Sequence, residues 1–371
     1  MSIVLTDEQV EFQKTVRSFL QSKVTEEDVR RLAADERGLD AELWQAFTEL
    51  EFHTLAVPEE NGGAGGSWVE LGLLLEEMGA VLVSSPFFAS TVLAAQALAE
   101  LDPDAQRRAW IEQLRSGELT ATLALPGRHG SYEPEVLSVR AVEAGAGWTL
   151  EGIQRQVIDG STAGLILLAA RTEEGYGLFA VERSEPELGA ASVATLDPTR
   201  KMASVELSGV AAIPLTLETG QWPGSDRVLD LARIGLAAEQ LGGARSCLEQ
   251  AVAYAKDRFQ HGQAIGSFQA IKHRCADIFL AIEAARSNVY HALSLAAEPG
   301  SSLDAAASVA KAATSEAFTQ AATGSVQIHG GIGFSWEHPA HLYLKRAKSS
   351  EILLGTAADH RERLASCLAM H

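Results

Sequence analysis

Residues 258–273 combine side chains and backbone features that can hold an anionic ligand. Arg258 stands at the expected end of one helix, Gly262 and Gly266 allow a bend, and a new helix begins directly afterwards. A guanidinium makes forked, charge-assisted hydrogen bonds to phosphate oxygens, and a helix N-terminus offers free N–H groups. The same spacing also fits a helix hairpin with solvated polar residues. The segment therefore permits a pyrophosphate site without requiring one.

Residues 327–334, with the sequence Gln-Ile-His-Gly-Gly-Ile-Gly-Phe, form a second candidate segment. Glycines that follow a long helix allow positive φ and a close approach of the backbone to a ligand. They equally fit a helix C-cap followed by a turn, and the spacing alone favours this cap.

The elements that must position these segments follow a helix–strand–helix order. Apolar residues at helical spacing predict a first helix that begins after Thr6. They predict further helices at 41–50, 69–78, 90–100 and 104–114. Short β-rich runs follow at 120–125, 138–142, 148–150, 164–170, 176–181 and 205–207. Helical patterns then return at 225–258, 267–295, 303–324, 340–353 and 357–368. We expect an α+β fold with an all-α domain (1–119), a middle antiparallel β-domain (120–222) and a C-terminal four-helix bundle (223–371).

Composition excludes several classes of protein. The 371 residues, 46% of them hydrophobic, suffice for two or three domains with sizeable cores. A net charge of −19 disfavours nucleic-acid binding, which needs basic surfaces. The apolar run at 163–170 is far shorter than the ~20 residues that span a bilayer, and no signal-peptide pattern opens the chain, so we expect a cytoplasmic protein that does not enter a membrane. Cys247, Cys275 and Cys367 form no metal-ligand or disulfide pattern, and we expect no metal.

The two glycine-containing segments resemble the C-terminal signatures of the FAD-dependent acyl-CoA dehydrogenase family, R-x-Q-F-G-x-P-I-x-x-F-Q and Q-x-x-G-G-x-G. The loop at 58–63, the run at 345–348 and the Gly-Thr at 355–356 extend this resemblance over nearly the whole chain. It implies an acyl-CoA substrate, a dimer of dimers and an electron-transfer flavoprotein as acceptor. It also implies that Thr356 contacts the cofactor and that the ADP part of FAD, belonging to a neighbouring subunit, is held by Arg258, Gln260, His261, Phe268, Gln269, Gln327, Gly330 and Gly331.

The segments that contact the flavin ring in this family are altered here. The family pattern S/T-E-P-x-x-G-S/T-D corresponds to residues 124–131, where Leu125 replaces the glutamate. The later pattern G-x-K-x-W-I-T/S-N-G corresponds to residues 152–160. Gln156 replaces the tryptophan that lies against the isoalloxazine, and Ile158 replaces the hydroxyl residue. We therefore expect this subunit's own hold on a flavin ring to be weak.

The catalytic base is also absent from its usual places. The family reaction needs a carboxylate near the α-carbon, with a pKa raised by burial. The two positions that carry it in the family are occupied by Leu354 and Ala232, which cannot accept a proton. Glu239, among small apolar residues, remains as a candidate base or as a structural partner of another helix. Arg233 matches a family arginine near the substrate pocket, and it equally fits a solvated helix arginine.

With these residues replaced, the chain resembles the non-catalytic subunit of heterotetrameric sterol side-chain acyl-CoA dehydrogenases. The resemblance implies a subunit of an α2β2 enzyme that dehydrogenates a bulky, sterol-derived acyl-CoA at the α,β bond. One alternative is a self-sufficient homotetramer with Glu239 as base. The other is a flavin-free scaffold protein, which would have no need for the retained ADP-binding segments.

Overall fold

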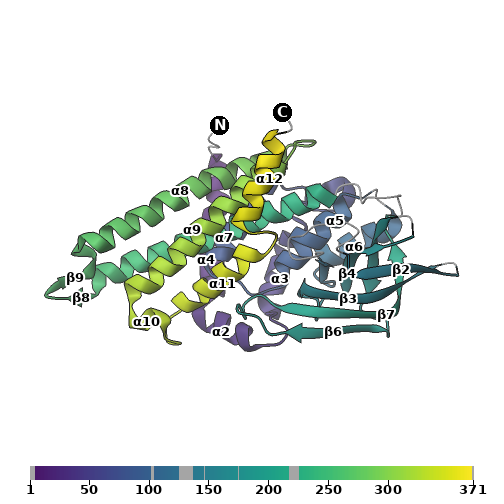
Figure 1. Ribbon diagram of the computed structural model, residues 1–371, viewed down its shortest axis with the longest axis horizontal. Coiled ribbons are helices and arrows are strands. Elements are labelled where there is room, and N and C mark those ends of the chain that lie inside the picture. The colour runs from purple at the N-terminus through teal and green to yellow at the C-terminus, as the bar shows by residue number, and fades with distance from the viewer. Residues whose placement is uncertain are drawn as a thin grey trace. The chain divides into compact units, whose positions relative to one another are not determined.

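The computed structural model describes residues 5–101, 104–124, 137–145, 147–173, 175–216 and 225–369 (Figure 1). The chain divides into two compact units, each built from separate stretches of sequence. Unit 1 comprises Met1–Val29, Trp68–Val83 and Arg233–His371, and unit 2 comprises Arg30–Ser67 and Ser84–Ala232. The boundaries of the three expected domains thus stay a prediction, because compactness alone groups the chain differently.

Short helices and one sheet make up most of unit 2. The helical segments are α3 (Ala41–Glu49), η1 (Phe52–Thr54), η2 (Glu59–Asn61), the π-helix η3 (Phe88–Ala94), α5 (Ala95–Ala99) and α6 (Ala105–Arg115). The helix α2 (Glu26–Ala34), which crosses the unit boundary, was not predicted from the sequence. Thr25 and Asp28 cap its start by hydrogen-bonding each other's backbone N–H. Val29 and Leu32, three residues apart and both buried, give this helix an apolar face as well.

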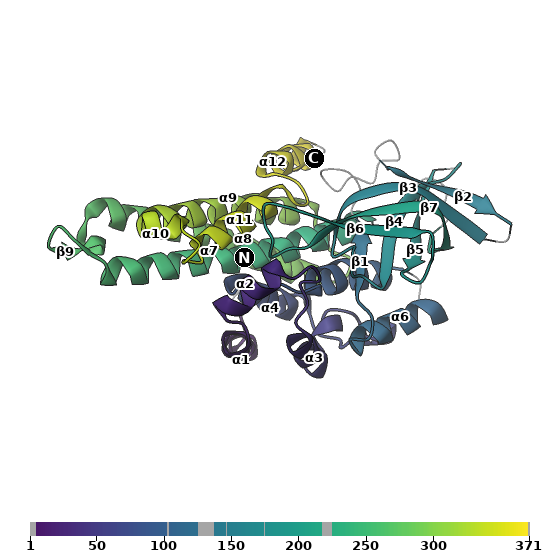
Figure 2. The same ribbon diagram turned by 90° about the horizontal axis from the view of Figure 1, so that it is seen from below.

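Among the described residues, the sheet of unit 2 contains seven strands. They are β1 (Ala121–Ala124), β2 (Val139–Ala144), β3 (Gly147–Ile158), β4 (Leu165–Arg171), β5 (Tyr176–Glu182), β6 (Leu188–Val193) and β7 (Met202–Pro214). The order is β1-β4-β2-β3-β7-β5, with β6 beside β7 and an additional pairing of β4 with β5 (Figure 2). The α+β class with a middle β-domain is confirmed, and most strand pairs are antiparallel as expected, whereas β1 pairs with β4 in parallel. The 40 residues between the two strands (125–164) give a connection long enough for parallel pairing.

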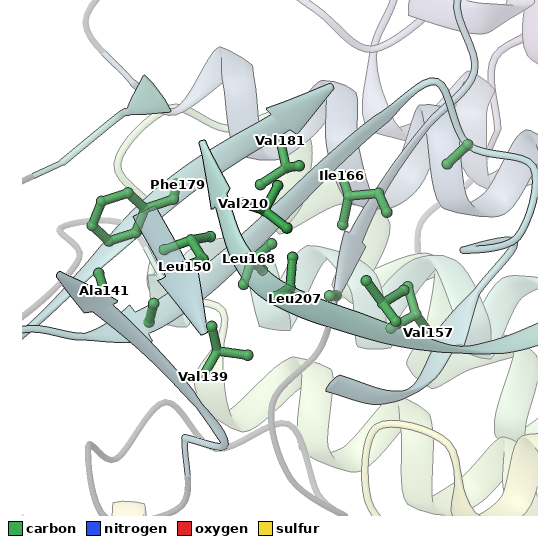
Figure 3. Packing of buried hydrophobic residues seen from close by; sticks show 14 residues of the cluster. Val139, Ala141, Leu150, Val157, Ile166, Leu168, Phe179, Val181, Leu207 and Val210 are labelled. Carbon is green, nitrogen blue, oxygen red and sulfur yellow. The ribbon is translucent and has the colours of Figure 1, made fainter. Parts of the chain in front are cut away.

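The interior of the sheet is a single apolar cluster, and a β-bulge keeps β7 in register with it. Gly209 has a φ of 78°, and the pairing of β3 with β7 shifts between Leu150 and Glu151. This extra residue lets both Leu207 and Val210 point inward. Figure 3 shows them with other buried side chains of the cluster, among them Val139, Ala141, Leu150, Val157, Ile166, Leu168, Phe179 and Val181.

A buried histidine in unit 2 makes stability depend on pH. His53 lies against the rings of Trp44 and Phe87, and burial lowers its pKa from 6.5 to about 4. Below pH 6.5 the unfolded chain binds a proton that the folded chain excludes, so stability is lost on acidification. We expect His53→Phe to remove about 2 kcal/mol of the loss between about pH 7 and about pH 5. Urea unfolding at both pH values measures this. As a control, the exposed His291 changed to Phe should leave the loss of stability unaltered. An equal loss of unfolding free energy between the two pH values in the natural protein and both variants would contradict the expectation.

Long helices make up unit 1. They are α1 (Asp7–Lys23), α4 (Trp68–Ala80), most of α7 (Ser225–Asp257), α8 (Gln269–Ala297), α9 (Asp304–His329), the short α10 (Gly331–Phe334), α11 (Ala340–Ile352) and α12 (Ala357–Ala369). The predicted C-terminal helices are therefore present, and α9 runs five residues further than its predicted end at Gly324.

Two glycines allow α4 and α7 to touch backbone to backbone. A Cβ added at Gly242 of α7 would lie 1.7 Å from the carbonyl oxygen of Glu76, and one at Gly79 of α4 would lie 2.0 Å from that of Glu239. Such distances are well inside van der Waals contact, so only glycine fits at either position.

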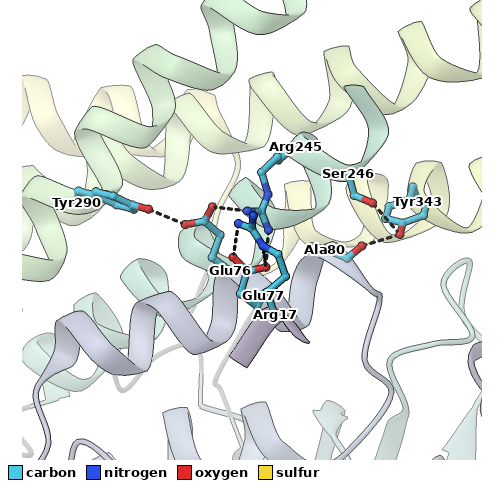
Figure 4. A network of polar contacts seen from close by, with 8 residues as sticks. All are labelled: Arg17, Glu76, Glu77, Ala80, Arg245, Ser246, Tyr290 and Tyr343. Atoms are coloured by element: carbon cyan, nitrogen blue, oxygen red, sulfur yellow. Dashed lines mark hydrogen bonds and ion pairs between the residues drawn. The ribbon is translucent and has the colours of Figure 1, made fainter. Parts of the chain in front are cut away.

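A network of charges lies beside this crossing (Figure 4). Glu77 accepts hydrogen bonds from Arg17 of α1 (2.9 Å) and from Arg245 of α7 (2.7 Å). Glu76 accepts one from the hydroxyl of Tyr290 of α8, at 3.0 Å. Four helices of unit 1 are thus tied together through the two adjacent glutamates.

Candidate functional site

The first candidate segment is a tight β-hairpin between α7 and α8. Its strands are β8 (Phe259–Gln260) and β9 (Gln263–Ala264), and His261 and Gly262 form the turn with φ values of 53° and 79°. Positive φ at both central residues is the backbone of a type I′ turn. Arg258 fixes the base of the hairpin because its carbonyl oxygen accepts a hydrogen bond from Ile265 N–H (2.8 Å).

The side chains of this hairpin are available to a ligand. Arg258, Gln260 and His261 are exposed, Phe268 is half-buried, and Gln269 is exposed at the first position of α8. The ring of His261 lies edge-on to that of Phe268, with centroids 6.3 Å apart.

The second candidate segment caps α9. Gly330 has a φ of 65° and donates its N–H to the carbonyl of Val326 (3.0 Å), as a C-cap does. Beyond it, α10 replaces the open turn expected from the sequence. Gln327, Gly330 and Gly331 are exposed, and a Cβ at either glycine would meet nothing within 4 Å. The backbone here is open to a ligand.

A small apolar cluster brings the two segments to the same end of unit 1. Ile328, inside the second segment, packs with Ala251 and Ala255 of α7, and Ile265 of the first segment packs against the same cluster. The rings of Tyr254 and His329 add a contact, with centroids 4.5 Å apart. An exposed guanidinium and an open glycine backbone in one place fit a phosphate-bearing ligand such as the ADP part of FAD.

Glu239, the candidate base, is engaged by a second helix. Its side chain on α7 is buried, with 7% of the residue exposed, and Arg346 Nη1 of α11 donates to its Oε1 at 2.7 Å. A structural pairing was one of the two roles expected, and this ion pair is the contact such a role requires. Arg233, one and a half turns earlier, is also 7% exposed, so its interpretation as a solvated helix arginine is wrong.

The turn between α11 and α12 contains the position where the family base would stand. Leu354 is buried (2% exposed) with a φ of 62°, and Gly355 has a φ of 102°. Thr356, expected to contact the cofactor, donates its hydroxyl to Asp359 Oδ2 (2.6 Å) and accepts from the Asp359 N–H (3.3 Å). Its hydroxyl is therefore engaged in hydrogen bonds with Asp359 at the start of α12.

Unit 2 contains the altered flavin-ring segments. Gln156 is exposed and has a φ of 59° at an irregularity of β3, between Gln154 and Val157. Ile158 is buried, and its carbonyl accepts a hydrogen bond from Thr122 Oγ1 (2.8 Å). The segment around Leu125 lies outside the described residues.

Two buried basic side chains that were not among the predicted site residues lie at the turn around Leu354. Lys311 of α9 has no exposed surface, and His360 of α12 is 3% exposed. The sequence could have indicated the burial of Lys311. It stands four residues after Ala307 and three before Thr314, and this spacing puts all three on the buried face of an alanine-rich helix. A lone lysine on such a face indicates a buried cation.

The protein-family comparison matches two regions of the chain. Residues 6–118 match the acyl-CoA dehydrogenase N-terminal domain, and residues 222–368 match the acyl-CoA dehydrogenase C-terminal domain. The chain belongs to the acyl-CoA dehydrogenase family.

Named relatives cover almost the whole chain. The acyl-CoA dehydrogenase IpdE2 of Mycobacterium tuberculosis is 34% identical over 97% of both chains. A chain of the ChsE4–ChsE5 complex from Mycobacterium tuberculosis is 29% identical, with a TM-score of 0.90 over 100% of both chains. A variant of the Tcur3481–Tcur3483 steroid ACAD is 31% identical, with a TM-score of 0.87 over 98% of both chains.

Among the residues that the structure describes, no helix combines the length and the apolar character of a membrane span. The same residues contain no group of three or more His, Cys, Asp or Glu side chains arranged to hold a metal ion.

Proposed function

We propose that this chain is the non-catalytic subunit of an FAD-dependent acyl-CoA dehydrogenase, assembled as α2β2 with a second subunit that carries the base. The observation that carries the proposal is Leu354, a buried apolar side chain at the position where the family resemblance puts the carboxylate. Ala232, at the alternative position, is also fully buried and apolar. Neither can abstract the α-proton of an acyl thioester.

The substrate proposed is a bulky, sterol-derived acyl-CoA. Two similar structures support both the substrate class and the paired assembly. One is a complex of two differently named chains, and the other is called a steroid ACAD. An electron-transfer flavoprotein as electron acceptor and a cytoplasmic location complete the proposal.

In this assembly, the chain contributes the binding of the ADP part of FAD. Arg258 directs an exposed guanidinium to the phosphates, and Gly330 and Gly331 allow close approach of the backbone. The bound flavin supplies the acceptor for the β-hydride of the acyl group. Gln156 offers no ring to stack on the isoalloxazine, so this chain binds one half of the cofactor better than the other.

Exposed apolar side chains in unit 1 support a subunit interface. Large exposed hydrophobic residues gather in the α7–α8 hairpin, on α8 and around α10, and monomeric proteins rarely leave so many uncovered. These residues are Phe259, Phe279, Leu280, Ile332, Phe334 and Trp336.

The test compares this chain purified alone with the same chain produced together with a base-bearing partner. We expect the chain alone to carry little flavin absorbance between about 350 and about 500 nm, and the pair to carry bound flavin and to oxidise acyl-CoA. In the pair, Arg258→Gln should weaken flavin retention about ten- to hundredfold, the effect of losing a charge-assisted hydrogen bond.

A matched variant and two outcomes make this test decisive. Arg37→Gln removes an exposed arginine of unit 2 and should leave flavin retention unchanged. Stoichiometric flavin and full activity in the chain alone would overturn the proposal in favour of a homomeric enzyme. Absence of flavin from every assembly would favour the flavin-free scaffold.

A self-sufficient homotetramer with Glu239 as base is the second candidate. Its support is the burial of this carboxylate, and the 2.7 Å hydrogen bond from Arg346 counts against it because the carboxylate is engaged in an ion pair with another helix. Glu239→Gln in the assembled enzyme separates the two. Turnover abolished with flavin retained supports the base, whereas turnover within about twofold supports the structural ion pair.

A further inference from the structure

Lys311 is a fully buried lysine surrounded by oxygen atoms of the backbone. Its Nζ donates to Ser315 Oγ (2.8 Å), to the carbonyls of Ser350 (3.0 Å) and Gly355 (3.1 Å), and at 3.4 Å to the carbonyl of Glu351. A cation removed from water requires such acceptors, because burial without them is costly. The side chain therefore joins α9 to the end of α11 and to the turn that follows.

The backbone acceptors are groups that a helix leaves without partners. Ser350 and Glu351 lie in the last turn of α11, which ends at Ile352, so their carbonyls have no intrahelical donor. A positive charge at this end of a helix is also favourable for its dipole. Lys311 thus supplies a cap from another element of the fold.

The turn itself has a conformation that needs support. Leu354 adopts a left-handed backbone with a φ of 62°, which costs a non-glycine residue about 1 kcal/mol. His360 Nε2 donates to the carbonyl of Leu354 at 3.0 Å, and the Thr356 N–H donates to Asp359 Oδ2 at 2.8 Å. Side chains of α9 and α12 therefore hold successive backbone groups of residues 350–356.

We propose that Lys311 is a positioning residue whose ammonium, held among carbonyl oxygens, fixes the left-handed turn at Leu354 and Gly355. We call this arrangement of Lys311 Nζ and the carbonyls of Ser350, Glu351 and Gly355 the clamp. All of its groups lie within this chain, so it does not depend on the proposed function. Its effect on a paired enzyme rests on that function, because the turn presents Leu354 at the position of the family base.

The charges around Lys311 make the clamp proton-dependent. Burial lowers the pKa of Lys311 to about 7, with Arg233 of α7 acting in the same direction and Glu351 of α11 and Asp359 of α12 acting in the opposite one. Burial, together with Lys311 and Arg233, lowers the pKa of His360 to about 3, so its ring is neutral near pH 7. A carbonyl only accepts, so the neutral ring carries its proton on Nε2.

Hydrogen exchange of the full chain tests the clamp locally. The reporting amides are those of Gly355, Thr356 and His360, all of which are hydrogen-bonded at the turn. In Lys311→Met, which keeps an unbranched apolar chain but removes the donors, we expect their protection to fall on the order of tenfold or more relative to the centre of α8. Lys348→Met removes an exposed lysine of α11 and should leave these amides unchanged.

Chemical rescue distinguishes a hydrogen-bonding cation from a merely structural side chain. Lys311→Ala leaves a cavity that fits n-propylammonium, which should restore protection at the three amides. Tetramethylammonium has the same charge but no N–H and should restore none. Rescue by both ions, or a loss in Lys311→Met that is equal at the turn and in α8, would overturn the proposal.

Hydrogen exchange of the unaltered protein provides a test that needs no variant. If both variants fail to fold, protection at Gly355, Thr356 and His360, corrected for the intrinsic exchange rate, should rise as the pH is raised from about 6 to about 8. Opening of the turn returns Lys311 to water, where its pKa is 10.5, so the open turn keeps a proton that the closed turn, with a pKa of about 7, releases. Protection that does not change with pH would contradict the clamp. None of these measurements uses flavin or activity, so a failure of the proposed function leaves the outcome interpretable.

Discussion

Gly242→Ala is expected to destabilise unit 1 by about 3 kcal/mol or more, at the upper end of the costs of overpacking. The new Cβ would lie 1.7 Å from the carbonyl oxygen of Glu76 and 3.0 Å from the backbone nitrogen of Ala80. Both atoms belong to the backbone of α4, which cannot turn aside as a side chain can. The helices α4 and α7 must therefore separate along their crossing. The free energy of unfolding in urea measures the loss.

Two further glycines calibrate this result. Gly331→Ala adds a Cβ with nothing within 4 Å and should change the free energy of unfolding by less than about 0.5 kcal/mol. Gly243→Ala, whose Cβ would meet the ring of Phe318 at 2.5 Å, should fall between the two because a side chain can shift. A loss below about 1 kcal/mol for Gly242→Ala would show that the crossing tolerates separation.

Arg245→Met is expected to cost about 3 kcal/mol, because it leaves two buried glutamates with less compensating charge. Burial raises the pKa of Glu76, and Arg245 opposes this rise. Although burial also acts to raise the pKa of Glu77, hydrogen bonds from Arg17 and Arg245 hold it below its ordinary value. The network in Figure 4 therefore balances two carboxylates against two guanidinium groups.

A double variant tests whether the cost is electrostatic. Arg245→Met combined with Glu77→Gln removes one charge of each sign, and we expect the pair to cost about 1 kcal/mol less than the sum of the single changes. Arg115→Met, which removes an exposed arginine paired with Glu112, should cost less than about 1 kcal/mol. Additive losses in the double variant would assign the effect of Arg245 to packing alone.

Local patterns in the sequence predicted the parts of the site that depend on local structure. The bend at Gly262 and the glycines after α9 require positive φ values and a helix end, and neighbouring residues indicate both requirements. The two short strands that flank the bend were not predicted. The apolar periodicity likewise predicted most of the long helices. β3 and β7 were predicted only as short runs, because their irregular pairing interrupts the alternation of apolar residues.

Contacts between distant residues could not be predicted in this way. The ion pair of Glu239 joins it to Arg346, 107 residues further along the chain, and no local pattern indicates such a pairing. The burial of Arg233 depends on helices that surround α7, so its own sequence context is equally compatible with exposure. The parallel pairing of β1 with β4 depends on the path of the chain between them, which alternation of apolar residues does not describe.

The backbone of the turn at Leu354 is held without any contribution from the side chain at that position. Its carbonyls are held by Lys311 and His360, and neither hydrogen bond uses the side chain of residue 354. The hydrogen bonds that hold the turn therefore do not require leucine at this position. For protein engineering, Leu354→Glu is the one-residue route to giving this chain a carboxylate there, at the cost of burying a charged group.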